Sequence, residues 1–152
     1  MNALIKKAAQ DIATADRVTA LTGAGISVES GIPPFRGKGG LWEKVDPMEY
    51  AHIDAFSRNP GKVWEVLIKG MKDTLDTAEP NDAHIGLTRL EKFGKLKTII
   101  TQNVDGLHQA AGSTDVIEFH GNFAWQRCTD CGDQCRTSEV NMDKIPPCCH
   151  CG

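Results

Sequence analysis

The sequence predicts an α/β fold built on a parallel sheet, with a second, smaller module near its end. Short β-prone runs alternate with helical patterns, and a glycine-rich turn directly follows the first run. Such alternation is typical of parallel α/β sheets. All six cysteines lie between Cys128 and Cys151, so they cannot crosslink the first 127 residues. Their clustering indicates the separate module.

The composition fits one ordinary domain and excludes several classes of protein. The chain has 152 residues, of which 40% are apolar and 24% charged, and its net charge is −3. That charge argues against direct nucleic-acid binding, and no apolar run approaches the roughly 18 residues of a membrane span. The start, MNALIKKAAQ, has no apolar core or cleavage site of a secretion signal. We therefore expect a cytoplasmic protein with a packed core.

The first half of the chain predicts a helix, a strand, a long loop and a second helix. Apolar residues four apart over 4–13 indicate the first helix. The β-prone run 17–22 then ends abruptly at the glycine-rich turn. Residues 31–50 contain many prolines and glycines, which favours a long ordered loop or short helical pieces, and such loops are usually functional. Asn59-Pro60 supplies an N-cap and a first-turn proline for the next helix.

The second half predicts two further strands separated by a helix. The elements are a helix capped by Asn81 or Asp82 that ends at Gly94, a strand at 97–101, a short helix ending at Gly112 and a strand at 116–120. Ligands of parallel α/β sheets bind beyond the carboxyl ends of the strands. We therefore expect the segments that follow the three strands to converge on one site.

The glycine turn after the first strand is suited to holding a phosphate group. Gly23 and Gly25 allow close backbone approach, and the start of the next helix would offer free N–H groups to an anion. The spacing departs from the dinucleotide fingerprint, because Val28 stands where a third glycine belongs. A tight turn without a ligand is the alternative interpretation.

Polar residues follow the other two strands. Gln102, Asn103 and Asp105 can hydrogen-bond the amides and hydroxyls of a nucleotide, although such residues are also common caps and turn formers. His120 ends the third strand and precedes a glycine, which suits a general base acting on a hydroxyl. A purely structural histidine is the alternative.

The cysteine spacing predicts a zinc site with four thiolate ligands. Cys128-x2-Cys131 and Cys148-x2-Cys151 are separated by sixteen residues, as in zinc knuckles. Four thiolates leave no open coordination position, so this zinc would be structural. Disulfides, free thiols, or Cys149 as a ligand in place of Cys148 are the alternatives.

Taken together, the strand ends and the cysteine pairs resemble the sirtuins, which are NAD-dependent protein deacylases. The matching stretches occur in the family's order and cover nearly the whole chain. They are Gly23-Ala24-Gly25-Ile26-Ser27, Gly31-Ile32-Pro33-Pro34-Phe35-Arg36-Gly37, Gly40-Leu41-Trp42, Thr101-Gln102-Asn103-Val104-Asp105-Gly106-Leu107-His108, His120-Gly121 and the paired Cys-x2-Cys. Each stretch is weak to moderate alone, but the ordered set is highly specific.

The resemblance implies an organisation and a set of site residues. A Rossmann-like NAD-binding portion would cover residues 1–122, with a helical insert at about 32–80, and a zinc-binding module would cover 123–152, after which the Rossmann portion would resume. The catalytic residues would be His120, Asn103 and Asp105. The cofactor-binding residues would be Gly23, Ala24, Gly25, Phe35, Arg36, Gln102, Asn103, Val104, Asp105 and His120. The ligands of one structural zinc ion would be Cys128, Cys131, Cys148 and Cys151.

The resemblance also implies an activity, namely NAD-dependent deacetylation of an acetyl-lysine protein or peptide. Nicotinamide would be released and O-acetyl-ADP-ribose formed. The family's desuccinylases carry Tyr-x-x-Arg where this chain has Leu67 and Gly70, which favours an uncharged acyl group. The family's catalytic domain continues past the fourth zinc cysteine, whereas this chain ends at Gly152. A non-catalytic, zinc-stapled module is therefore one alternative. The other is mono-ADP-ribosyl transfer, in which a nucleophile other than the acyl oxygen captures the ribose.

Overall fold

The protein contains a three-stranded parallel sheet, as the alternation of strands and helices predicts. The computed structural model describes residues 2–43, 45–148 and 150–151. Strands β1 (Val18–Thr22), β2 (Leu96–Thr101) and β3 (Val116–Glu118) lie in the order β1-β2-β3, and both neighbouring pairs are parallel. Their carboxyl ends therefore lie at the same edge of the sheet, where the sequence places its candidate site residues.

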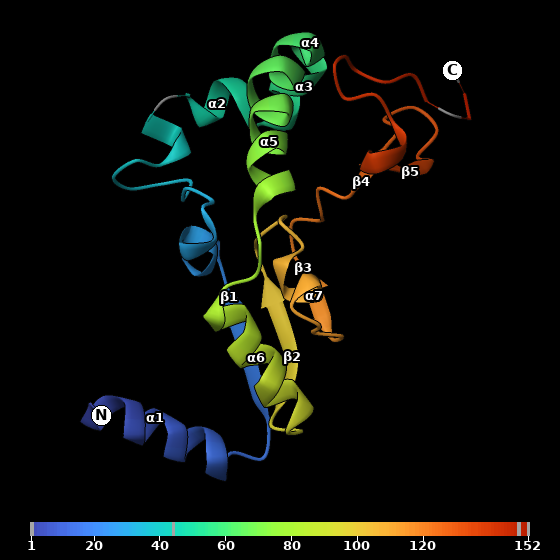
Figure 1. Cartoon of the computed structure of the whole chain (residues 1–152). Coiled ribbons are helices and arrows are strands. Elements are labelled where there is room, and N and C mark those ends of the chain that lie inside the picture. Colours follow the sequence, from blue (N-terminus) through green and yellow to red (C-terminus); the bar gives the residue numbers. More distant parts are fainter. Residues whose placement is uncertain (1, 44, 149, 152) are drawn as a thin grey trace.

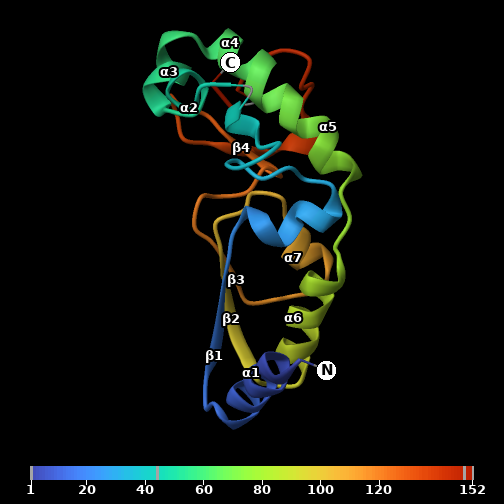
Figure 2. The same ribbon diagram turned by 90° about the vertical axis from the view of Figure 1, so that its left-hand side faces the viewer.

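In the described part of the chain, helices cover one face of this sheet. Helices α6 (Asp82–Lys92) and α7 (Leu107–Ala110) lie on the same side of the strands, as Figure 2 shows. The buried apolar residues of this layer include Leu96 and Ile99 on β2 and Leu107 on α7. On the strands, Leu21 and Ile117 share a row with Ile100 across the sheet, yet Leu21 is 71% exposed and Ile117 50%. The opposite face is thus apolar and largely uncovered.

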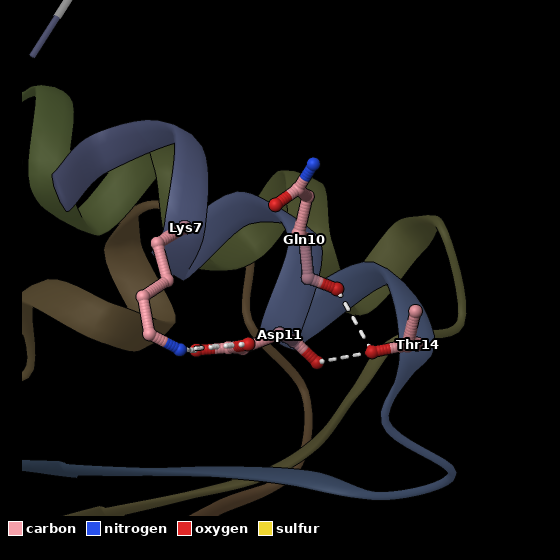
Figure 3. A network of polar contacts seen from close by, with 4 residues as sticks. All are labelled: Lys7, Gln10, Asp11 and Thr14. Atoms are coloured by element: carbon pink, nitrogen blue, oxygen red, sulfur yellow. Dashed lines mark hydrogen bonds and ion pairs between the residues drawn. The ribbon is translucent and has the colours of Figure 1, made fainter. Parts of the chain in front are cut away.

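The predicted first helix forms as α1 (Ala3–Thr14), with the Asn2 side chain accepting a hydrogen bond from the backbone N–H of Leu4. Its polar side is held by local contacts, including a 3.0 Å ion pair between Lys7 and Asp11 and a hydrogen bond from Thr14 Oγ1 to the carbonyl of Gln10 (Figure 3). None of its residues is buried, and Leu4 is 72% exposed. The helical prediction is confirmed, but its apolar stripe faces solvent.

The segment between β1 and the helical region consists of short pieces. The expected helix after the glycine turn is a 3-10 helix, η1 (Ala24–Ser30), which ends at Gly31 in the left-handed region. A second 3-10 turn, η2 (Leu41–Glu43), and helix α2 (Pro47–Tyr50) follow. A Cβ on Gly40 would lie 2.9 Å from the carbonyl oxygens of Phe35 and Gly37, so a glycine lets this loop close on itself.

Helix α3 (Ile53–Arg58) lies within the expected helical insert but precedes the helix that the periodicity predicted. The helix expected after Asn59-Pro60 runs through α4 (Pro60–Val63), a π-helical turn η3 (Trp64–Ile68) and α5 (Lys69–Thr77). The Asn59 side chain accepts a hydrogen bond from the backbone N–H of Lys62, as expected of an N-cap. These helices lie beyond the carboxyl edge of the sheet (Figure 1).

The cysteine module contains an antiparallel hairpin of β4 (Trp125–Arg127) and β5 (Gln134–Arg136), followed by η4 (Thr137–Glu139). It packs beside the helical region, since buried Trp64 donates a 2.9 Å hydrogen bond from Nε1 to the carbonyl of Met142.

Strand β3 is two residues shorter than expected, because the chain turns at Gly121, whose φ is 82°. No helix in the described ranges is long and apolar enough to cross a membrane.

Candidate functional site

The segments that follow the three strands meet at the carboxyl edge of the sheet. The register pairs Thr22 with Thr101 and Thr101 with Glu118, so the next residues of each strand start from adjacent positions. Gln102 donates its backbone N–H to the carbonyl of Thr22 at 3.0 Å, which extends the pairing into the glycine turn. The predicted convergence of these segments is therefore confirmed.

Ser27 connects two of these segments. Its side chain is fully buried, and its hydroxyl donates a 2.7 Å hydrogen bond to a carboxylate oxygen of Asp105. The same hydroxyl accepts a 3.0 Å hydrogen bond from the amide Nδ2 of Asn103. The other Asp105 oxygen accepts the backbone N–H of Leu107 at the start of α7. Asn103 and Asp105 are thus fixed relative to the turn that follows β1.

Two buried histidines lie behind this network. Asn81 caps α6, and its backbone N–H donates to Nδ1 of His84 in a reciprocal capping arrangement. His108 Nε2 lies 2.9 Å from Thr22 Oγ1, and the two imidazole rings meet edge to face with centroids 4.9 Å apart. Burial lowers the pKa of both histidines, and each keeps one ring nitrogen without a hydrogen-bond partner among the described residues. Sequence position alone did not distinguish either histidine.

A cavity of about 1110 Å³ opens beside these strand ends. Most of the predicted cofactor residues line it, namely Ala24, Gly25, Phe35, Arg36, Gln102, Asn103, Val104 and His120. Gly23 and Asp105 do not line it: Gly23 lies next to Gln102, and Asp105 contacts Ser27 and Leu107 behind the cavity wall. The structure therefore brings the predicted set together but places these two residues outside the cavity lining.

The rest of the cavity wall comes from the long loop and the helical region. The rings of Phe35 and Trp42 stack with centroids 5.4 Å apart. Leu67 and Met71 contribute an apolar wall from η3 and α5. Among the described lining residues none is an aspartate or glutamate, whereas Arg36 supplies a positive charge. The cavity is thus suited to a ligand that combines anionic and uncharged parts.

The four predicted zinc ligands lie together in the cysteine module. The sulfur atoms of Cys128, Cys131, Cys148 and Cys151 all lie within 4.8 Å of one another. Two of the distances, Cys128 to Cys151 at 3.7 Å and Cys131 to Cys148 at 3.5 Å, match the sulfur separation of about 3.8 Å that tetrahedral Zn–S bonds of about 2.3 Å require. The alternative ligand Cys149 lies outside the described residues.

Backbone N–H groups around two of these cysteines favour the thiolate form that a metal requires. The N–H groups of Cys151 and His150 point at Cys148 Sγ and lower the pKa of that thiol to about 6. The N–H groups of Cys131 and Asp130 likewise lower the pKa of Cys128. The donor set, its spacing and these backbone donors fit a tetrathiolate metal centre.

Comparison with known proteins agrees with this geometry. Residues 23–152 match the Sir2 family. NAD-dependent protein deacylase 2 of Archaeoglobus fulgidus is 49% identical over 97% of this chain. A crystal structure of a Sir2 homolog–NAD complex superposes with a TM-score of 0.86 at 43% identity, over 97% of this chain and 57% of that chain. A Sir2 variant solved with deacetylated p53 peptide and 3'-O-acetyl ADP-ribose gives 0.82 at 35% identity, over 97% of this chain and 61% of that chain.

These similarities extend over nearly all of this chain but only part of its relatives. The chain spans 59% of the length of the Archaeoglobus protein. Residues 23–152, which match the family, contain strands β2 and β3, the glycine turn and the cysteine module described above. On the extent of the match and its identity, the chain belongs to the Sir2 family.

Proposed function

We propose that this cavity is the nicotinamide and acyl-lysine site of an NAD-dependent protein lysine deacetylase of the sirtuin type. The observation that carries the proposal is the convergence of eight predicted cofactor residues on one cavity at the carboxyl edge of the sheet. This edge is where parallel α/β folds bind nucleotides. The Sir2 relatives solved with NAD and with 3'-O-acetyl ADP-ribose support the same choice of ligand.

The cavity fits the chemical character of NAD. When bound, NAD supplies a ribose carbon that becomes electrophilic as nicotinamide leaves. Ala24 and Gly25 of the glycine turn line the cavity, where the glycine leaves the backbone accessible, and Arg36 would offer a cation to the phosphates. Phe35 lines the cavity and is stacked on Trp42, so it can shield the reacting face from water.

Three residues would carry the chemistry. His120 lines the cavity, and its imidazole would accept a proton from a ribose hydroxyl. Asn103 is 95% buried, and its amide is held by Ser27, so it would orient the ribose and a water molecule. The carboxylate of Asp105 would act through Ser27 and the backbone, and direct contact with the nicotinamide carboxamide would require it to move toward the cavity.

The substrate would be an acetyl-lysine protein or peptide. The acyl group would meet an apolar wall, because Leu67 lines the cavity and no carboxylate or arginine is contributed to the described lining by η3 or α5. This supports an uncharged acyl group over a succinyl group. The cysteine cluster would hold one structural zinc ion, and a cytoplasmic location remains a prediction.

The test is product analysis with NAD and acetyl-lysine or succinyl-lysine peptides. The proposal predicts nicotinamide, deacetylated peptide and O-acetyl-ADP-ribose in equal amounts, with little reaction of the succinyl peptide. ADP-ribose attached to protein would instead favour the transferase. Absence of both turnover and NAD binding would contradict the proposal and favour the non-catalytic module.

A further inference from the structure

A tryptophan and an arginine form a small platform on the hairpin beside the cavity. Trp125 and Arg136 are directly opposite each other on β4 and β5. The Arg136 guanidinium carbon lies 4.7 Å from the centre of the Trp125 ring, which is a cation–π contact. Cross-strand neighbours on one face of a hairpin are close enough to hold such a geometry. We call this pair the Trp–Arg platform.

The platform is open to solvent. Trp125 is 47% exposed, and Arg136 is exposed. In the part of the chain that the structure describes, no carboxylate forms an ion pair with Arg136. A guanidinium stacked on an aromatic ring still presents its N–H groups at its edges, where they can receive a carboxylate. The acidic residues Asp130 and Asp133 lie in the turn at the other end of the hairpin.

The platform is anchored to the cavity. Trp125 lines the cavity together with His120, and the intervening residue Phe123 donates its backbone N–H to the carbonyl of Val104 at 2.9 Å. On the β5 side, Thr137 donates its N–H to the carbonyl of Ala124 at 2.8 Å. The platform therefore keeps a defined position relative to the proposed catalytic histidine.

From this arrangement we infer that the Trp–Arg platform selects protein substrates that carry an acidic residue near the acyl-lysine. The inference rests on the proposed function, because it assumes that an acyl-lysine reaches His120. The charge of the cavity supports this inference. The described cavity lining contains Arg36 and no carboxylate, so no negative charge there would repel an acidic peptide. The adjoining ring of Trp125 would pack against the aliphatic part of a glutamate side chain.

The test measures binding of fluorescent acetyl-lysine peptides by anisotropy. One series moves a single glutamate through the positions on either side of the acetyl-lysine, and a matched series carries lysine instead. At the position that reaches the platform, the glutamate peptide should bind about two- to fivefold tighter, the range of an exposed ion pair. The preference should shrink as salt is raised.

Charge reversal identifies the residue responsible. Arg136→Ala should abolish the preference, and Arg136→Glu should invert it toward the lysine peptide. Arg17→Glu is the matched control, because Arg17 is exposed just before β1 at the opposite end of the sheet. Both positions are exposed, so circular dichroism should show folded proteins.

Equal binding of both series by the unmodified protein would overturn the inference, and so would a preference that Arg136→Glu leaves unchanged. Failure of the proposed function would look different. In that case the glutamate preference and its inversion would persist in the binding data, while neither peptide would be deacetylated. Deacetylation of both peptides with no charge preference would support the proposed function and contradict the role of the platform. Binding of no peptide at all would also count against the platform.

Discussion

Replacing Ser27 with alanine tests the network that fixes the site. Ser27 is fully buried and is hydrogen-bonded to both Asn103 and Asp105. Ser27→Ala removes one oxygen without adding volume. It leaves a buried amide donor and one carboxylate oxygen each short of a partner. The carboxylate of Asp105 keeps its second contact, with the N–H of Leu107.

The expected loss follows from these two contacts. A neutral hydrogen bond contributes about 1 kcal/mol and one to a charged acceptor about 1.5–3 kcal/mol. Because Asp105 is partly accessible to water, its hydrogen bond contributes less to stability than a fully buried one would. The substitution should therefore reduce the free energy of unfolding by about 2–3 kcal/mol. For a domain of this size, each kcal/mol shifts Tm by about 2–4 °C, which predicts a decrease of roughly 4–12 °C.

The assay is thermal unfolding followed by far-ultraviolet circular dichroism. Ser138→Ala, at an exposed serine in η4, is the matched control and should change stability by less than about 0.5 kcal/mol. A double-mutant cycle with Asp105→Asn should give a coupling energy of about 1 kcal/mol or more. An unchanged Tm in Ser27→Ala, or strictly additive effects in the cycle, would contradict a stabilising role for the hydrogen bonds of Ser27.

Three further predictions address the metal, the buried histidines and the open sheet face. Metal analysis should find one zinc ion, which Cys128→Ser abolishes and Cys135→Ser retains, because Cys135 lies outside the four-sulfur cluster; zinc retention by Cys128→Ser would contradict the assigned ligands. Burial lowers the folded-state pKa of His84 and His108. The unfolded chain therefore binds more protons than the folded chain. The free energy of unfolding should be independent of these histidines above a pH of about 6.5 and should decrease as the pH falls below it, with a smaller decrease in His108→Gln. A series of urea-unfolding measurements in which the free energy of unfolding does not decrease below pH of about 6.5 would contradict this prediction. The bare apolar face of the sheet should cause concentration-dependent self-association in sedimentation, and Leu21→Ser should reduce it with little loss of stability, because Leu21 is 71% exposed. A monomer at every concentration, or self-association that the substitution leaves unchanged, would contradict this.

Most of the scaffold could be predicted because it depends on local signals. Asn59 and Asn81 cap the helices that they were expected to cap, and Gly94 ends α6 in the left-handed region. The alternation of strands and helices was enough to place the three strand ends at one edge. The cysteine spacing likewise predicted a four-sulfur cluster.

What the sequence did not predict depends on packing between distant segments. His84 and His108 are separated along the chain, and only the fold brings their rings to 4.9 Å and buries them. The capping partnership between Asn81 and His84 is a local signal that could have identified one of the two. The sequence pattern predicted helix α1 and the apolar stripe along it, but it could not show that no described element covers that stripe. Asp105 was expected in the cavity, whereas Ser27 holds it behind the wall.

The most direct test of the central claim compares NAD-dependent deacetylation by the unmodified protein and by His120→Ala. Both proteins should bind NAD, and the variant should deacetylate an acetyl-lysine peptide about 10²- to 10⁴-fold more slowly, because this is the usual contribution of a general base. Undiminished turnover in His120→Ala would contradict the account.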